Sequence, residues 1–293
     1  MVDRAEKNDK IIAITAAMPD GTGLSDFAKA YPTRFFDVGI AEEHALTFAC
    51  GLATEGYIPV FAVYSTFAQR AFDQLIHDAA LQDLHIIIAL DRAGLVANDG
   101  ATHHGIFDTA FIPEIPNVTF RSPLDFASLE KEFDEAIAGS GVQVIRYPKS
   151  GDISLDGFKQ GAGFACKDFG DAPKTAIVTY GRMIKQAVNA CERVNTNTRI
   201  IALTKLNPID FSLLSKLLDG CESIVFVEEG IKNGGVSQRI AATLAEMNLI
   251  NDKAIKIMAI DNIFPEHGSN GELFKALKLS TEDIATALTE VSK

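Results

Sequence analysis

The sequence predicts an α/β protein built as two consecutive three-layer domains, each with a mainly parallel sheet between helices. Strand-like apolar runs alternate with helical patterns along both halves of the chain, which is typical of parallel sheets covered by helices. The length of 293 residues favours two compact units over one. Between them lies a glycine-rich stretch without clear periodicity. We therefore expect a first domain over 1–155, a linker over 156–172 and a second domain over 173–293.

In the first half, five apolar runs are expected to form strands, at 11–15, 35–38, 59–64, 86–90 and 142–146. The run at 86–90 is continuous rather than alternating, as expected of a central strand buried on both faces. Asp91 and Arg92 then lie at the carboxyl end of that strand. This edge is where open α/β sheets bind their ligands.

The second half repeats the alternation. Strands are expected at 175–179, 199–203, 224–227 and 255–260, with helical patterns around Val188, Leu213, Ile240 and Leu273. Gly234 and Gly235 precede one helix and favour a tight turn over an anion site. We assign this half to assembly.

Composition excludes several classes of function. The net charge of −12 argues against bulk nucleic-acid binding, because phosphate contacts need concentrated lysines and arginines. No apolar run approaches the roughly 20 residues that span a bilayer, and the N-terminus has no apolar signal core, so we expect a cytoplasmic protein without membrane contact. The four scattered cysteines indicate reduced core thiols rather than a disulfide framework or a zinc site.

The first candidate residue is Glu42. Gly39 precedes a helical pattern that ends near Gly56, so Glu42 falls in the first turn of the helix. By position alone, a carboxylate that only complements the helix dipole is the favoured interpretation.

A second helical pattern begins after Tyr64, where Ser65 or Thr66 can cap it. Phe67 and Arg70 share a face other than the apolar stripe of this helix. Such a pair at the ligand edge of a sheet can stack on a ring and hold an anion. The alternative is a partly packed phenylalanine beside a solvated arginine.

The third candidate is the long loop 91–105, which is punctuated by glycines and dense in titratable groups. Asp99 and His103 could position a carbonyl substrate or exchange protons with it. A metal held by Asp99, His103 and His104 is the rival interpretation, but no further ligands are evident, so we expect no metal site in this chain.

Arg146 ends the strand at 142–146, so Arg70, Arg92 and Arg146 make a plausible phosphate cluster at one edge. Three unrelated surface cations would look the same in sequence.

Three segments taken together resemble the 1-deoxy-D-xylulose-5-phosphate synthase family. They are Phe36-Asp37-Val38-Gly39-Ile40-Ala41-Glu42-Glu43-His44-Ala45, Tyr64-Ser65-Thr66-Phe67-Ala68-Gln69-Arg70, and the loop 91–105. Their order and spacing match, and the resemblance continues through Arg146-Tyr147-Pro148 to Glu266-His267-Gly268-Ser269. It therefore covers nearly the whole chain and implies a thiamine-diphosphate pyrimidine-binding fold followed by a transketolase C-terminal-like fold.

The resemblance also implies roles for the candidates. Glu42 would hydrogen-bond the aminopyrimidine ring of thiamine diphosphate, Phe67 would stack on it, and Tyr64 and Ile40 would lie nearby. Asp99 and His103 would orient the acceptor and transfer protons, and Arg70, Arg92 and Arg146 would bind its phosphate. The implied reaction joins pyruvate, after decarboxylation, to D-glyceraldehyde 3-phosphate, for isoprenoid precursor, thiamine and pyridoxal biosynthesis.

The sequence departs from the family in two places. His104 stands where glutamine is commoner. No Gly-Asp-Gly followed by an asparagine about thirty residues later occurs, and the resemblance implies that this motif binds Mg²⁺ and the diphosphate from an N-terminal domain. We therefore expect a split subunit or a fragment, inactive alone, which pairs with that domain and forms a homodimer.

Three alternatives remain open at this stage. A split transketolase and the β subunit of a pyruvate dehydrogenase share the fold and the glutamate. A noncatalytic assembly module would keep the fold alone, although the joint presence of Glu42, Phe67, Asp99 and His103 argues against it.

Overall fold

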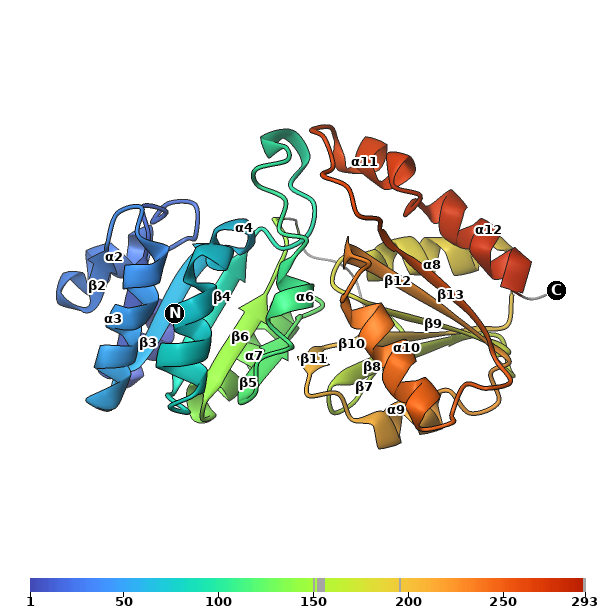
Figure 1. The fold of residues 1–293 in the computed structure, drawn as a ribbon, viewed down its shortest axis with the longest axis horizontal. Helices are drawn as coiled ribbons and strands as arrows, with labels where there is room; N and C mark the ends of the chain where they lie inside the picture. The colour runs from blue at the N-terminus through green and yellow to red at the C-terminus, as the bar shows by residue number, and fades with distance from the viewer. Residues whose placement is uncertain (150, 152–155, 195, 292–293) are drawn as a thin grey trace.

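Two sheets lie side by side in the computed structural model, which describes residues 1–149, 151, 156–194 and 196–291. The N-terminal sheet and its helices fill one half of the molecule and the C-terminal sheet fills the other (Figure 1). Buried apolar side chains from both halves, such as Phe120 and Phe226, belong to one packed core. The two domains therefore share apolar contacts rather than being joined by a linker alone.

The first sheet has seven strands in the order β11-β5-β6-β4-β3-β1-β2. All neighbours pair in parallel except β11, which is antiparallel to β5. The strands are β1 (Ile11–Thr15), β2 (Phe35–Asp37), β3 (Ile58–Tyr64), β4 (Ile86–Asp91), β5 (Val118–Arg121), β6 (Val142–Arg146) and β11 (Lys205–Asn207). The parallel arrangement places the carboxyl ends of β2, β3, β4 and β6 at one edge.

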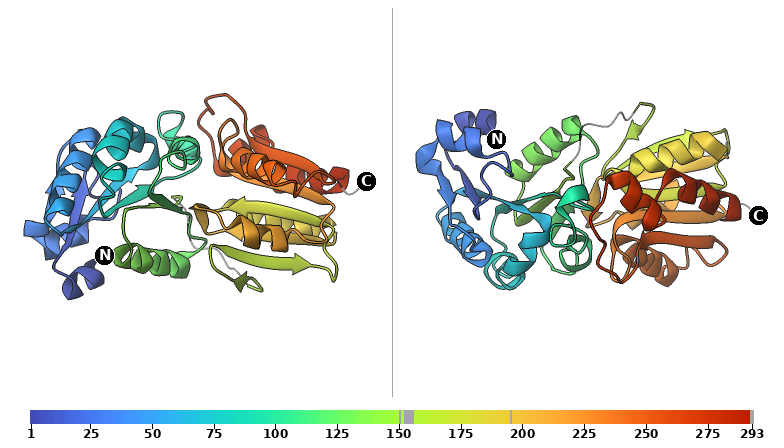
Figure 2. Two further views of the ribbon diagram at one scale, coloured as in Figure 1. Left: turned by 60° about the horizontal axis from the view of Figure 1, so that its bottom comes forward. Right: turned by 90° about the horizontal axis from the view of Figure 1, so that it is seen from above.

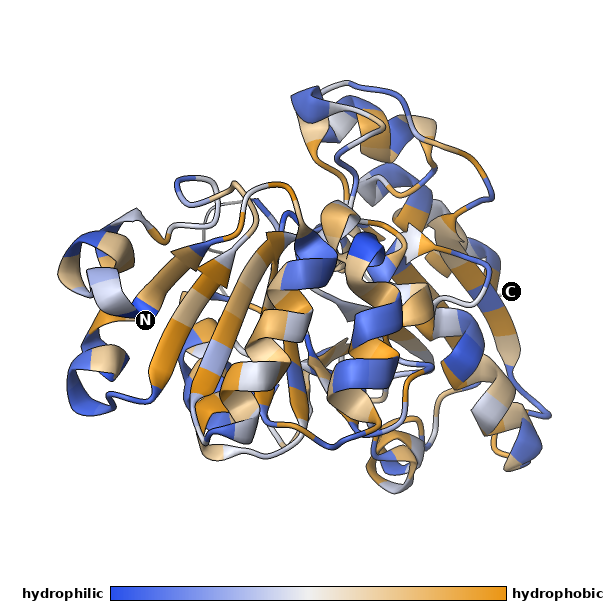
Figure 3. Cartoon of the chain, turned by 60° about the vertical axis from the view of Figure 1, so that its left-hand side comes forward, coloured by the Kyte–Doolittle hydropathy of each residue, from blue (hydrophilic) through white to orange (hydrophobic). Residues whose placement is uncertain are grey.

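Helices cover both faces of this sheet. Its strands are apolar along most of their length (Figure 3), and because alternate residues point to opposite faces, both faces are apolar. Alanines and leucines of α3 (Glu42–Thr54) and of the irregular helix that follows β3 pack on one face. Helices α1 (Val2–Lys7), α2 (Ser25–Ala30) and α7 (Phe126–Ala138) pack on the other. The irregular helix consists of α4 (Ser65–Ala68), η2 (Gln69–Ala71), α5 (Phe72–Gln74) and η3 (Leu75–Ala80), and short turns form η1 (Pro32–Arg34), η4 (Ala97–Asp99) and α6 (Asp108–Phe111).

The second sheet has the order β13-β12-β9-β10-β8-β7. Its strands are β7 (Lys159–Gln160), β8 (Phe164–Phe169), β9 (Thr175–Tyr180), β10 (Thr198–Leu203), β12 (Ser223–Ile231) and β13 (Ala254–Ile260). Helices α8 (Met183–Val194), α11 (Asn270–Ala276) and α12 (Thr281–Val291) pack on one face, and α9 (Phe211–Leu217) and α10 (Val236–Glu246) on the other (Figure 2). The second domain is therefore also three-layered, as expected.

The predicted linker needs correction. The segment 156–172 contains β7 and β8, and β8 pairs antiparallel with β10 over six residues. Its side chains alternate poorly because β8 lies near the sheet edge, so periodicity did not reveal it. The expected boundary at 173 does not separate the two sheets completely. The strand β11 follows β10 in sequence, beyond that boundary, but joins the first sheet.

Nine runs expected to be strands are strands, within three residues at the starts and ends except for the longer carboxyl end of β12. Within the described part of the chain, no helix is long and apolar enough to cross a membrane.

Candidate active site at the edge of the first sheet

Glu42 begins α3, as predicted, and its side chain is buried although the residue next to it, Glu43, is exposed. Nη1 of Arg70 donates a hydrogen bond to Oε1 of Glu42 at 2.7 Å. Oε2 of the same carboxylate is buried and has no hydrogen-bond partner among the described residues. A buried carboxylate oxygen without a donor is unfavourable, so the site is built for a donor that the chain itself does not supply.

Three rings gather beside this carboxylate. The Tyr64 and Phe67 rings are nearly parallel with centroids 6.0 Å apart, and the His103 ring lies edge-on to Phe67 at 5.5 Å. The guanidinium of Arg70 lies 5.0 Å from the centroid of Phe67 and so connects this aromatic cluster to Glu42. Phe67 is only half-buried and therefore keeps part of its surface for another flat group.

Tyr64 ends β3 and has two close neighbours besides Phe67. The guanidinium of Arg92 lies 3.9 Å from its ring centroid. The hydroxyl end of the Tyr64 side chain lies so close to Gly21 that a Cβ there would meet the hydroxyl oxygen at 1.8 Å. Burial raises the pKa of the Tyr64 hydroxyl, so the group stays a protonated donor at neutral pH.

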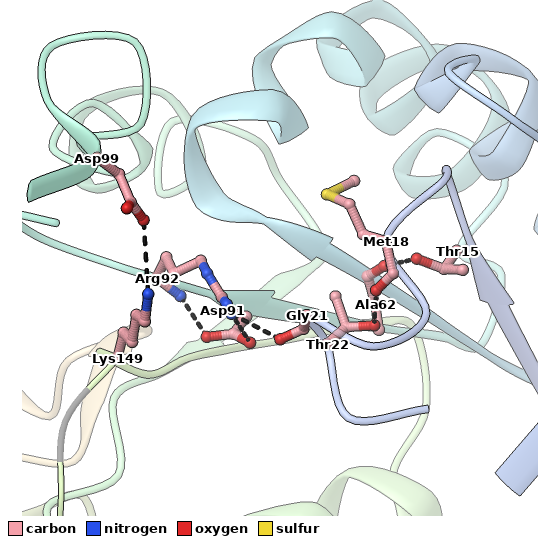
Figure 4. A network of polar contacts seen from close by, with 9 residues as sticks. All are labelled: Thr15, Met18, Gly21, Thr22, Ala62, Asp91, Arg92, Asp99 and Lys149. Atoms are coloured by element: carbon pink, nitrogen blue, oxygen red, sulfur yellow. Dashed lines mark hydrogen bonds and ion pairs between the residues drawn. The ribbon is translucent and has the colours of Figure 1, made fainter. Parts of the chain in front are cut away.

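Arg92 forms a compact polar network at the end of β4 (Figure 4). Its Nη1 donates to Oδ2 of Asp91 and to the carbonyl oxygen of Gly21, both at 2.6 Å. Its backbone has a φ of 57°, an uncommon conformation for a non-glycine residue, which the bond from Arg92 N to Oδ1 of Asp91 supports. Burial raises the pKa of Asp91. Arg92 is thus fixed at the site edge by the first domain alone.

The loop that follows carries Asp99 and His103 above the sheet edge. Asp99 Oδ2 lies 3.6 Å from Nζ of Lys149, and both side chains are substantially exposed (Figure 4). Nδ1 of His103 lies 2.9 Å from the Thr102 hydroxyl. Because Nδ1 has this partner, Nε2 is the ring nitrogen that remains for an incoming ligand.

The structure pairs Arg146 with a carboxylate of its own domain, so its phosphate contact stays a prediction. Its side chain is buried at the end of β6, and Nε donates to Oδ2 of Asp108 at 2.9 Å while Nη2 donates to Oδ1. The guanidinium also lies 5.1 Å from the ring centroid of Tyr180 in the second domain. Arg146 therefore forms a buried pair with Asp108 close to a ring of the second domain.

The structure also places three other residues from the sequence analysis, Ile40, Thr66 and His104. Ile40 is 77% exposed just before α3, so its cofactor contact stays a prediction. Thr66 does not cap the helix through its side chain; its hydroxyl donates to the carbonyl oxygen of Thr102 in the loop. His104 accepts a hydrogen bond from Val96 N on Nδ1, and Nε2 lies 3.0 Å from the Glu266 carbonyl oxygen. Both ring nitrogens of His104 thus have partners that hold the loop in place.

Sequence reasoning missed Lys149 and Gly21. Lys149 is three residues beyond the strand end that drew attention to Arg146, and it is a more exposed cation beside Asp99. Gly21 lies in an unremarkable turn, and only the position of Tyr64 reveals why no side chain fits there. Together the edge presents a carboxylate oxygen without a donor, an aromatic cluster and accessible cations. Such a set can bind a flat, hydrogen-bonding ring next to an anionic group.

Two family models match the chain. Residues 1–151 match the transketolase pyrimidine binding domain, and residues 170–284 match the transketolase C-terminal domain. Together they account for most of the sequence and divide it close to the position of the predicted linker.

Curated relatives match the chain over nearly its whole length. It is 41% identical over 300 residues to 1-deoxy-D-xylulose-5-phosphate synthase of Clostridium perfringens strain SM101, with 99% of the chain and 48% of that protein covered. The enzymes of the same name from Clostridium kluyveri and Caldanaerobacter subterraneus are 41% and 40% identical, with 47% of each covered. The chain thus spans about half the length of the curated relatives it matches.

Solved structures share the fold. A protein described as a split gene transketolase, inactive beta4 tetramer, superposes with a TM-score of 0.83 at 28% identity, and 99% of this chain and 94% of that chain are covered. Transketolase of Campylobacter jejuni superposes with a TM-score of 0.82 at 15% identity, with 99% of this chain and 45% of that one covered. The latter likeness concerns the fold alone.

Proposed function

Given that the chain belongs to the transketolase family, with a pyrimidine-binding domain followed by a C-terminal domain, we propose that it is the C-terminal half of a 1-deoxy-D-xylulose-5-phosphate synthase. In this proposal the chain binds the pyrimidine half of thiamine diphosphate and the acceptor substrate. Pyruvate is the donor, and D-glyceraldehyde 3-phosphate is the acceptor.

The partnerless oxygen of Glu42 carries the proposal. Oε2 is buried with no donor in the described chain, while Oε1 accepts from Arg70, whose guanidinium also lies 5.0 Å from the Phe67 ring centroid. An aminopyrimidine ring brings a nitrogen that carries a proton in one of its forms, and it has a flat face for Phe67. The residues present therefore fit the pyrimidine half of the cofactor.

Thiamine diphosphate, when bound, supplies the carbon nucleophile that attacks the donor carbonyl and the electron sink for decarboxylation. Glu42 holds a proton at the ring nitrogen through a charge-assisted hydrogen bond. Phe67 and the Tyr64 ring behind it fix the plane of the pyrimidine, and the burial of Glu42 excludes water from its carboxylate. These are contributions of orientation and electrostatics.

The acceptor is proposed to lie between the aromatic cluster and the loop above it. Lys149 lies 3.6 Å from Asp99 and Arg92 follows the end of β4, so both are proposed phosphate contacts, with Arg70 on the pyrimidine side and Arg146 at the end of β6. Asp99 accepts a hydrogen bond from an acceptor hydroxyl, and Nε2 of His103 exchanges a proton with the acceptor carbonyl oxygen.

Magnesium and the diphosphate are proposed to be held by a diphosphate-binding domain that pairs with this chain. Among the described residues, no three His, Cys, Asp or Glu side chains are grouped to hold a metal ion. The curated relatives are about twice as long as the region they share with this chain. We propose that the assembled enzyme is a homodimer and acts in the cytoplasm.

The C-terminal subunit of a split transketolase is a second candidate, because the split gene transketolase structure matches this chain over nearly its full length. The donor distinguishes the two. The chain is mixed with a diphosphate-binding domain, thiamine diphosphate, Mg²⁺ and D-glyceraldehyde 3-phosphate, and either pyruvate or a ketose phosphate is supplied. Product formation with pyruvate but not with the ketose phosphate supports the synthase. Product formation with the ketose phosphate but not with pyruvate supports the transketolase.

A further inference from the structure

The loop that carries Asp99 and His103 has its base in the second domain. Leu95 and Ile106, at its two ends, are buried in the apolar cluster formed by β9, β12 and α8. Backbone hydrogen bonds between Gly94 and Gly105 close the loop between them. In Figure 1 the loop rises between β4 and α6 next to the segment that leads to α11. The loop therefore extends from the first domain but packs on the second.

A buried ion pair of the second domain holds the first turn of this loop. Glu229, in β12, accepts a hydrogen bond from Leu95 N on Oε1 at 2.6 Å. Arg182, just before α8, donates from Nε to Oε2 of Glu229 at 2.7 Å and from Nη2 to the Leu95 carbonyl oxygen at 2.6 Å. Both polar groups of the Leu95 backbone are thus bound by one Arg–Glu pair, and both charged side chains are less than 10% exposed.

Gly94 fits this arrangement closely. A Cβ on Gly94 would lie 2.7 Å from the carboxyl carbon of Glu229, and its φ of 84° is one that glycine adopts readily. The carboxylate therefore packs directly against the loop backbone, and a side chain at this position would displace it.

A second anchor lies on the far side of the loop. The His104 ring is buried and connects Val96 N to the carbonyl oxygen of Glu266, in the segment before α11. The backbone of Gly268 in the same segment donates to the carbonyl oxygen of Ala97. Residues 96–104 thus stand between two fixed points supplied by the second domain.

We propose that Arg182 and Glu229 are positioning residues for the acceptor, acting through the Leu95 backbone on the loop that carries Asp99 and His103. This inference rests on the proposed function and deepens it, because it gives the second domain a role in the reaction besides assembly. Groups that meet a substrate must be held within a few tenths of an ångström of their productive positions, and a tethered backbone supplies that restraint.

The restraint itself is measurable without turnover. Hydrogen–deuterium exchange of residues 94–105 is compared in the full chain between wild type and the double variant Arg182→Met with Glu229→Leu. Both charges are removed together so that neither is left buried and unpaired. The matched control replaces another paired Arg–carboxylate couple of this domain, Arg199→Met with Asp168→Leu, which lies on β10 and β8.

We expect exchange in the loop to rise roughly tenfold or more in the first variant, since a charge-assisted hydrogen bond is lost, and to stay unchanged in the control. Unchanged exchange of residues 94–105 in both variants overturns the proposal that Arg182 and Glu229 restrain the loop. Where the first variant unfolds, the milder substitution Arg182→Lys, which keeps the charge but loses the fork that binds Glu229 and Leu95 together, gives the same comparison.

Kinetics of the assembled enzyme test the consequence. The positioning role predicts a KM for the acceptor raised roughly tenfold, with the KM for the donor and the affinity for thiamine diphosphate within about twofold of wild type. A uniform loss of all three, or no kinetic change despite faster exchange, overturns the positioning role. If the wild-type assembly has no activity with any donor, the proposed function fails, while the exchange experiment still decides whether the second domain holds the loop.

Discussion

Arg70 and Glu42 form a one-sided pair: one carboxylate oxygen of Glu42 accepts from Nη1 of Arg70 at 2.7 Å, and the other has no donor in the described structure. Arg70 is nearly half exposed, whereas the side chain of Glu42 is 2% exposed. Arg70 therefore provides the counter-charge of the buried carboxylate at one oxygen, and the second oxygen remains for a ligand.

Replacing Arg70 by leucine is expected to lower the free energy of unfolding of the chain by about 1 to 2 kcal/mol, since Glu42 then stays buried without a cation and the exposure of Arg70 limits the loss. Adding Glu42→Gln to Arg70→Leu is expected to restore most of it, because a neutral amide needs no counter-charge. Urea denaturation of both variants checks this, and additive losses would contradict the coupling.

Breaking the Arg146–Asp108 pair is expected to cost far more. Arg146→Met leaves Asp108 buried without its cationic partner, with an expected loss of about 3 to 5 kcal/mol in the free energy of unfolding. The double variant with Asp108→Leu is expected to recover most of that loss. A normal stability for Arg146→Met, combined with weaker phosphate binding in the assembled enzyme, would assign Arg146 to the phosphate site rather than to the pair.

The buried Glu228 gives a pH dependence with a definite sign. Burial raises its pKa above the usual 4.5, although the Tyr180 hydroxyl and Ser237 N donate to it. The folded state therefore holds this proton more tightly than the unfolded state, so the contribution of Glu228 is fully present below pH 4.5 and is lost as pH rises through the folded pKa. Glu228→Gln is expected to gain stability relative to wild type as pH rises from 4.5 to 8.

Glu222 is the matched control for this measurement. Its exposed carboxylate has a lowered pKa because Lys174 donates a hydrogen bond to it. Its contribution is present above pH 4.5 and is lost as pH falls, so Glu222→Gln should show the opposite trend. The same trend in both variants, measured by denaturation across pH, would refute the assignment for Glu228.

Gly21 is expected to tolerate no side chain. Gly21→Ala directs a Cβ into the Tyr64 hydroxyl, so the Tyr64 side chain must shift, at an expected loss of about 1 to 3 kcal/mol. Gly51→Ala is the control, because nothing lies within 4 Å of a Cβ at this position in α3, and alanine there should stabilise the helix by about 0.5 to 1 kcal/mol. Thermal unfolding distinguishes the two, and equal effects would contradict the contact.

Local patterns predicted much of the fold and part of the site. The continuous run at 86–90 identified β4 as a central strand, and the glycine before α3 placed Glu42 in a first turn. Both signals are local in sequence. The strand β8 escaped prediction because charged residues lie within it, next to the sheet edge, and β5 was not predicted either.

The rest depends on contacts between residues far apart in the chain. Nothing near Arg146 in sequence reveals that Asp108 occupies its guanidinium, and nothing near Leu95 reveals that Glu229 binds its backbone. Sequence position placed Arg146 at the correct sheet edge, but the buried partner decided what the side chain does.

Carbon dioxide release from pyruvate tests the central claim most directly. The chain is mixed with a diphosphate-binding domain, thiamine diphosphate, Mg²⁺ and D-glyceraldehyde 3-phosphate, as wild type, as Glu42→Gln, and as the neighbouring exposed control Glu43→Gln. We predict release by the wild type and Glu43→Gln only in the mixture, and a fall of roughly 100-fold or more for Glu42→Gln. Equal release by all three variants would contradict the role of Glu42 and the active site built around it.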